Sequence, residues 1–205
     1  MSDLQLEHYL ESSQYINFDD AQVRRKAGTL AEGLDQLKDI AEACFKFVRD
    51  EIRHSLDHDD AKVTIRASEV LELGTGFCYA KSHLLAALLR ANRIPAALCY
   101  QRLNNGQGGF SLHGLNAVHL ENHGWYRIDP RGNKQGVDSK FTPPEECLAF
   151  NLAESEENVA GYWLEPLPEV INALQAFSSV AEMRMNIPDL ANFKQADSKR
   201  SIFSS

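Results

Sequence analysis

One stretch of this chain predicts a helix that carries apolar side chains on almost every side. It runs from Tyr79 to Arg90 and reads YAKSHLLAALLR. Such a helix has no polar face to turn toward water, so it belongs at the centre of a folded domain. The other elements must therefore pack around this one helix, which Asn92 is suited to end.

The residues just before this helix, GTGFC at 74–78, carry the first candidate for chemistry. Two glycines end a shorter predicted helix at 67–73 and make a tight turn, so Cys78 falls in the first turn of the central helix. There a thiol meets backbone N–H groups without helical partners and the positive end of the helix dipole, and both favour the thiolate. The N–H groups of Cys78 and Tyr79 can also hold an oxyanion. Local sequence leaves open that Cys78 is only a buried residue at the start of a helix.

Two further helices are predicted before the glycines. The first begins where Asp19 or Asp20 can cap it. The second spans about 35–53, because its apolar residues recur at helical spacing. Cys44 lies in that apolar stripe and is expected to be a packing residue. The polar stretch 54–62 that follows is expected to be a solvated connector.

A β-meander is predicted after the central helix, with strands at 96–102, 112–120 and 125–129. Helices followed by a meander indicate the α+β class. His113 stands near the start of the second strand and Asp129 near the end of the third. An antiparallel hairpin brings these positions close, so one strand pair could supply an imidazole and the carboxylate that fixes its tautomer. The glycine- and asparagine-rich loop 103–110 is a possible lid over the cleft.

Beyond residue 140 the patterns weaken. Pro143-Pro144-Glu145-Glu146 is expected to start a short helix, and Glu165 to Arg184 to form another. The chain is expected to be one domain over 1–205, with a core at about 20–140, a helical C-terminal extension at about 141–190 and a frayed tail at 197–205.

Composition and hydropathy exclude some classes of binding partner and location. The formal net charge is −8, from 21 basic and 29 acidic residues, which argues against nucleic acid or an anionic membrane as a partner held by bulk charge. No stretch approaches the roughly 18 consecutive apolar residues that span a membrane, and the polar N-terminus is no secretory signal. A cytoplasmic location is therefore expected, with reduced cysteines. The cysteines show no CxxC spacing, so no structural zinc site is expected from Cys44, Cys78, Cys99 and Cys147.

Two blocks of this sequence together resemble the transglutaminase-like superfamily. The first, residues 76–96, resembles the family's nucleophile region: a glycine, one residue, the nucleophilic cysteine, a helix ending in Leu-Leu-Arg, then Gly-Ile-Pro-Ala. The second, residues 113–130, resembles the family's His-Ala-Trp…Gly-Trp…Asp-Pro block. The family has Ala-Trp where this chain has Gly114-Leu115, and a glycine where it has Arg93.

The resemblance covers about residues 35–133 and implies a papain-like α+β fold with a Cys-His-Asp triad, as in a small bacterial-type member. Carried over, Cys78 is the nucleophile, His113 the general base and acid, and Asp129 the residue that orients the imidazole. No cofactor and no metal ion is implied.

Other histidines offer alternatives to this assignment. His119 shares a strand face with His113 and could be the base, although aligning the blocks through Gly124-Trp125 favours His113. A metal site is conceivable from His119, His123 and Asp129, but a hairpin turn would hold it poorly. A second metal site could be formed by His54 and His58, but a solvated connector is the simpler interpretation of that stretch.

The sequence thus predicts cysteine-dependent acyl transfer on an amide through a thioester acyl-enzyme. The substrate would be a peptide, a protein or a small amide. Hydrolysis, as in a protease or amidase, is favoured over transglutaminase activity because nothing in the sequence indicates an amine site. The alternative is a catalytically silent domain of the same fold that binds a peptide or protein.

Overall fold

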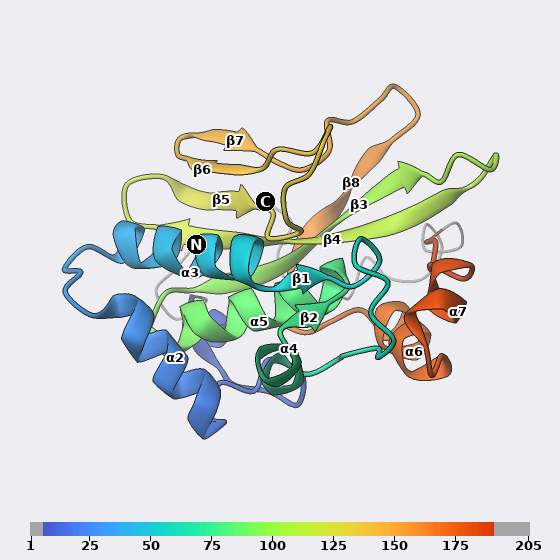
Figure 1. The fold of residues 1–205 in the computed structure, drawn as a ribbon. Coiled ribbons are helices and arrows are strands. Elements are labelled where there is room, and N and C mark those ends of the chain that lie inside the picture. Colours follow the sequence, from blue (N-terminus) through green and yellow to red (C-terminus); the bar gives the residue numbers. More distant parts are fainter. Residues whose placement is uncertain (1–5, 191–205) are drawn as a thin grey trace.

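Residues 6–190 are described by a computed structural model of the chain. The predicted tail 197–205 lies outside these described residues. The α-helices gather on one side of a four-stranded antiparallel sheet, and α5 (Cys78–Ala91) lies between that sheet and the helices α2 and α4 (Figure 1). The α+β class is confirmed.

Most of the helices lie where the spacing of apolar residues predicts them. They are η1 (His8–Leu10), α2 (Ala21–Ala31), α3 (Leu37–Glu51), α4 (Ala67–Leu73), α5 (Cys78–Ala91), α6 (Pro168–Ala176) and α7 (Val180–Arg184). Of the two predicted caps for α2, Asp20 is the one used, because its carboxylate accepts the N–H groups of Gln22 and Val23. Gly74 ends α4 with φ 64°, the left-handed conformation that glycine adopts without strain.

The central helix α5 is buried as predicted. Of its 14 residues, all except Ala91 are buried, including the leucines that face the sheet and α3. Its single buried arginine, Arg90, donates hydrogen bonds to the carbonyls of Glu11, Ala96 and Leu164. These bonds compensate the burial of a charge and tie three distant segments to the end of α5.

The main sheet has the strand order β5-β4-β3-β8. Its strands are β3 (Ala96–Asn104), β4 (Phe110–Leu120), β5 (Gly124–Ile128) and β8 (Glu157–Trp163). One face packs on α5, and the other carries a smaller cluster in which Trp125 stacks on Tyr162 at 4.8 Å between ring centroids. The predicted meander is therefore confirmed, and β8 extends it at one edge.

Two short pairs of strands complete the fold. β1 (Arg53–His54) pairs in parallel with β2 (Thr75–Gly76), which leads directly into α5. β6 (Lys140–Thr142) pairs with β7 (Glu145–Cys147). The β1–β2 pair places the start of the 54–60 loop beside the residues that precede Cys78.

The prediction of a helical extension at 141–190 is wrong for its first half. Residues 143–144 instead form the turn between β6 and β7, and residues 145–146 lie in β7. Phe141 contacts the rings of Phe45 and Tyr126, which holds its segment in a strand, and the position before a proline disfavours helix. β8 was missed because an edge strand that is exposed on one side shows little apolar pattern. The predicted helix 165–184 is two helices, since the Ser179 hydroxyl caps a new one.

The connector 54–62 was also predicted wrongly in part. His54 and Ser55 are buried, because pairing of β1 with β2 draws the start of this segment into the protein. Within residues 6–190, no helix has both the length and the apolar character needed to cross a membrane.

Candidate active site

Cys78 is the first residue of α5. Its backbone N–H and that of Tyr79 occupy the first two helical positions, where no intrahelical acceptor exists. The Cys78 sulfur accepts a hydrogen bond from the backbone N–H of Gly114, at 3.5 Å. The thiol therefore lies against β4, the strand that carries His113.

Gly114 makes this close approach possible. A Cβ added at this residue would lie 2.7 Å from Cδ1 of the Tyr79 ring and 3.2 Å from the Tyr79 Cα. The ring is held there because the Tyr79 hydroxyl donates a hydrogen bond to the carbonyl of Leu112, at 2.6 Å. The space that a side chain would take is filled by Tyr79, which accounts for a glycine where the family pattern has alanine.

His113 joins the thiol to a carboxylate. Its Nε2 lies 2.7 Å from Oδ2 of Asp129, at the end of β5, and its ring is also hydrogen-bonded to the Cys78 side chain. Because Nε2 is engaged by Asp129, Nδ1 is the ring nitrogen left for the sulfur. The three predicted side chains are thus brought together in the order thiol, imidazole, carboxylate.

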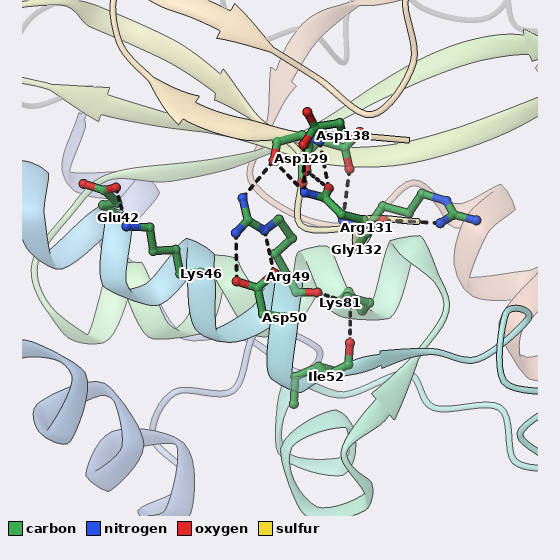
Figure 2. Close-up of polar contacts among 12 residues, drawn as sticks. Glu42, Lys46, Arg49, Asp50, Ile52, Lys81, Asp129, Arg131, Gly132 and Asp138 are labelled. Carbon is green, nitrogen blue, oxygen red and sulfur yellow. Dashed lines mark hydrogen bonds and ion pairs between the residues drawn. The ribbon is translucent and has the colours of Figure 1, made fainter. Parts of the chain in front are cut away.

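Asp129 is completely buried and surrounded by donors. Its Oδ1 accepts the backbone N–H of Arg131 at 3.1 Å, and its Oδ2 accepts that of Ala149 at 3.1 Å. Its carbonyl accepts the Ser139 hydroxyl at 2.8 Å. Asp129 and the backbone of Arg131 meet where β5 ends, above α3 and α5 (Figure 2). These bonds leave the carboxylate oriented toward His113 and stabilise its negative charge.

The imidazole is held in its charged form. Burial alone would lower the pKa of His113, but the charge and hydrogen bond of Asp129, helped by Cys78, raise it to about 10. At neutral pH the ring is therefore an imidazolium beside a thiol, which is the arrangement that favours a thiolate.

Comparison with known proteins identifies the family of this chain. The family model for the transglutaminase-like superfamily matches residues 24–130, a little over half of the chain. The chain belongs to the transglutaminase-like superfamily. No curated protein sequence matches it significantly.

A solved structure shows the same fold at low sequence identity. A protein of Cytophaga hutchinsonii described as a "Putative Cysteine Protease" aligns with a TM-score of 0.53 and 17% identity, over 63% of this chain and 43% of that one. The periplasmic domain of TgpA from Pseudomonas aeruginosa aligns with a TM-score of 0.46 and 20% identity, over 63% and 48%. This chain spans less than half the length of either structure. Membership of the superfamily supports a cysteine-dependent enzymatic role in general terms.

The candidate site is closed to solvent. Cys78 is 2% exposed and His113 5%. The ring of Phe150, in the loop after β7, meets the His113 ring edge-on at 4.9 Å between centroids. Sequence reasoning missed Phe150, because the stretch around it has no periodicity that would assign it to the site.

His54 was also missed as a neighbour of the site. Its ring is buried against Phe77, the residue before Cys78, at 5.2 Å between centroids. The signal available in the sequence was its position directly after the apolar stripe that ends with Ile52. Burial, together with the positive charge of Arg131, holds the pKa of His54 well below its usual range, so its imidazole is neutral.

The alternative histidines lie elsewhere. His119 packs edge-on against Trp125, at 5.5 Å between ring centroids, and His58 and His123 are exposed. Within the described part of the chain, no three or more His, Cys, Asp or Glu side chains are grouped so as to hold a metal ion. A cavity of about 580 Å³ between α2 and α4 involves none of the three candidate residues.

The remaining cysteines have no such partners. All four are free thiols, and burial raises the pKa of both Cys44 and Cys99 to about 12. The thiol of Cys147 donates a hydrogen bond to the carbonyl of Asp138. Cys78 differs from all of them in lying between a helix N-terminus and an imidazolium.

Proposed function

We propose that this protein is a cysteine-dependent amidase or peptidase that works through a thioester acyl-enzyme. The observation that carries the proposal is the placement of His113 between the Cys78 thiol and the buried Asp129 carboxylate. A positioned imidazole is the usual general base and acid for a cysteine nucleophile, and a carboxylate that fixes its orientation completes the set.

In the first half-reaction the Cys78 thiolate attacks the carbonyl carbon of an amide. The carbon–sulfur bond forms as the carbonyl electron pair moves to oxygen, and the N–H groups of Cys78 and Tyr79 are the proposed donors to that oxyanion. Collapse breaks the carbon–nitrogen bond, and the leaving amine takes the proton of the His113 imidazolium. The products are a free amine and a thioester on Cys78.

In the second half-reaction the neutral His113 ring takes a proton from water as its oxygen attacks the thioester. The carbon–sulfur bond breaks, a carboxylic acid leaves and the thiolate–imidazolium pair is restored. We propose water rather than an amine as the acceptor. Asp57 and Asp129 already accept bonds from cationic or N–H groups, so neither is free to bind an ammonium substrate.

The substrates we propose are peptides, proteins or small amides, and neither nucleic acid nor a membrane is needed as a partner. We also propose a reducing compartment such as the cytoplasm. The four free cysteines support that location.

The first test is the rate at which iodoacetamide alkylates each cysteine between pH 5 and 9, followed by mass spectrometry of the peptides. We expect Cys78 to react fastest below pH 7 and His113→Gln to lower that rate by at least about tenfold. His119→Gln is the matched control, because it removes the competing imidazole from the same strand and should leave Cys78 unchanged. Cys44 and Cys99 should stay unreactive.

Because Cys78 is buried, iodoacetamide could fail to reach its thiol, so a second measurement detects the acyl-enzyme directly. Incubation with p-nitrophenyl acetate should give an acetyl thioester on Cys78, detected as an added mass that hydroxylamine removes. Loss of both signals in His113→Gln, and not in His119→Gln, supports the proposal. Ordinary alkylation of Cys78 together with no acyl-enzyme in the unmodified protein would leave the silent peptide-binding domain as the better interpretation.

A further inference from the structure

A cavity of about 530 Å³ lies beside the candidate site but contains none of its three residues. It opens between the C-terminal end of α3, the 52–58 segment and the 132–134 loop. Figure 2 shows Lys81 in this region, bonded to the carbonyls of Arg49 and Ile52 and close to Gly132. Its lining is Arg49, Asp50, Ile52, Arg53, His54, Asp57, His58, Lys81, Gly132, Asn133 and Lys134. A volume of this size is in the range of small-molecule sites.

Lys81 places a buried amine at the wall of the cavity. The side chain is completely buried, and its Nζ donates to the carbonyl of Arg49 at 3.4 Å and to that of Ile52. Within residues 6–190 no carboxylate lies at ion-pair distance from this nitrogen. Burial lowers the pKa of Lys81 to about 7, because the two carbonyls do not replace the water that an ammonium group loses. An anion in the cavity would compensate that loss.

His54 contributes a second buried group without a partner. It is 5% exposed, and neither of its ring nitrogens has a hydrogen-bond partner among the described residues. The Asp57 carboxylate oxygen is 3.6 Å from its Nδ1, beyond hydrogen-bond distance. A neutral imidazole keeps one N–H, and a buried donor left unbonded costs about 1–3 kcal/mol. An acceptor atom in the cavity would remove that cost.

The charges around the cavity favour an anion. The lining holds four basic side chains (Arg49, Arg53, Lys81 and Lys134) and two carboxylates (Asp50 and Asp57). Arg49 pairs with Asp50 and Arg53 with Asp60, which leaves the amines of Lys81 and Lys134 as the donors nearest to an anion. Asp57 is moreover shared between Lys134 and Arg131, which lies at the edge of the candidate site. This excess of positive charge is local, since the whole chain carries a net charge of −8. Such a concave, positively charged site attracts oxyanions.

We propose that this cavity binds a small organic anion through its carboxylate or phosphate oxygens, with Lys81, Lys134 and His54 as the donors. Lys81 lies three residues after Cys78 on α5, so the ligand would sit about one helical turn from the candidate nucleophile. The site does not depend on the proposed acyl transfer, because none of its lining residues belongs to the candidate triad.

The test is a titration of the full-length protein with inorganic phosphate, citrate and sodium chloride at constant ionic strength, followed by the NMR signals of the His54 ring. We expect saturable shifts with phosphate, citrate or both, and none with chloride. Phosphate alone assigns a phosphate ester as the ligand class, and citrate alone a carboxylate.

Two single-charge variants make this test specific. Lys134→Gln should raise the dissociation constant by about fivefold or more, since a charged donor is removed from the rim. Lys46→Gln is the matched control, because Lys46 is an exposed lysine paired with Glu42 on α3 and does not line the cavity (Figure 2). It should leave the dissociation constant unchanged.

Removal of the buried amine gives the largest effect. Lys81→Met keeps most of the volume and should weaken binding by about tenfold or more, with folding checked by the melting temperature. If this variant does not fold, the comparison of the dissociation constants of Lys134→Gln and Lys46→Gln still tests the proposal. The proposal would be overturned by His54 chemical shifts that change linearly with salt concentration or that change equally with chloride. Equal dissociation constants for Lys134→Gln and Lys46→Gln would also overturn it.

Discussion

Gly114 has no room for a side chain, because Tyr79 lies where its Cβ would be. We expect Gly114→Ala to push β4 away from the start of α5, lower the free energy of unfolding by about 1–3 kcal/mol and slow alkylation of Cys78. Urea denaturation and the alkylation assay measure the two effects.

Gly28→Ala is the control for this substitution. Gly28 lies within α2 and has nothing within 4 Å of an added Cβ, so the same change there should stabilise the protein by about 0.5–1 kcal/mol through helix propensity. If Gly114→Ala were as harmless as Gly28→Ala, the close contact between β4 and Tyr79 would not constrain the site.

Asp129 sets the charge of His113. The pKa of His113 is raised from 6.5 to about 10, so this pairing stabilises the fold fully below pH 6.5, and the stabilisation is lost as pH rises through about 10. Asp129→Asn removes the charge. We expect its deficit in unfolding free energy to be largest below pH 6.5 and to shrink toward pH 10, measured by urea denaturation across that range.

The same variant should lower turnover of a cleaved amide by about a hundredfold or more, because the imidazole loses its orienting charge. Asp138→Asn is the control, since that carboxylate is exposed and pairs with Lys140, the first residue of β6. Equal activity of the two variants would argue against a role for Asp129 in the proposed reaction.

At the scale of elements, the end of α5 carries a strained residue. Arg93 has φ 61°, in the left-handed region, at the position where the family pattern has glycine. A residue with a Cβ pays about 1–2 kcal/mol for that conformation. We therefore expect Arg93→Gly to raise the free energy of unfolding by about 0.5–1 kcal/mol.

The matched substitution is Arg24→Gly, at an exposed position inside α2. There glycine should lower the free energy of unfolding by about 0.5–1 kcal/mol, because it only weakens the helix. Urea denaturation of both proteins gives the comparison, and effects of the same sign would show that the φ of Arg93 is not strained.

The short strand pairs show how contacts between elements override local pattern. The prolines at 143 and 144 indicate a helix start in isolation, yet Phe141 is buried against rings from α3 and β5. His54 belongs to a polar stretch, yet β1 is drawn inside by pairing with β2. In both cases the partner is distant in the chain, so a local window cannot contain the cause.

At the scale of the whole molecule, Asp57 links the helical side to the loop after β5. Its carboxylate pairs with Arg131 at 2.8 Å and with Lys134 from the loop after β5, while Asp57 itself follows β1 on the helical side. Partial burial opposes its ionisation, but these two cations hold the pKa of Asp57 well below its usual range. Loss of this ion pair should weaken the contact between the segment after β1 and the loop after β5.

We expect Asp57→Asn to lower the free energy of unfolding by about 1–2 kcal/mol at pH 7. A depressed carboxyl pKa contributes stability that is complete above the unfolded value of 3.8. It is lost progressively as pH falls from there through the lower folded-state pKa, so the difference between the two proteins should be smaller at pH 3 than at pH 7. Denaturation at pH 7 and pH 3 measures this. Asp35→Asn, at an exposed position before α3, should show no such difference.

Local pattern was sufficient for much of this molecule. The all-round apolar character of α5, the glycines before Cys78 and the alternation of β3 and β4 depend only on neighbouring residues, so the helices, the meander and the α+β class could be predicted. Cys78, His113 and Asp129 could be selected because two motifs agree in order and spacing.

Only the tertiary structure shows the surroundings of those three residues. The contact of Gly114 with Tyr79, the burial of His54, the Phe150 ring on His113 and the donors around Asp129 all join segments far apart in the chain. Burial and electrostatic environment are properties of the packed molecule, because they depend on which distant groups exclude water or bring a charge near. The sequence determined which side chains are capable of the chemistry, and the packing decided their charge and their exposure.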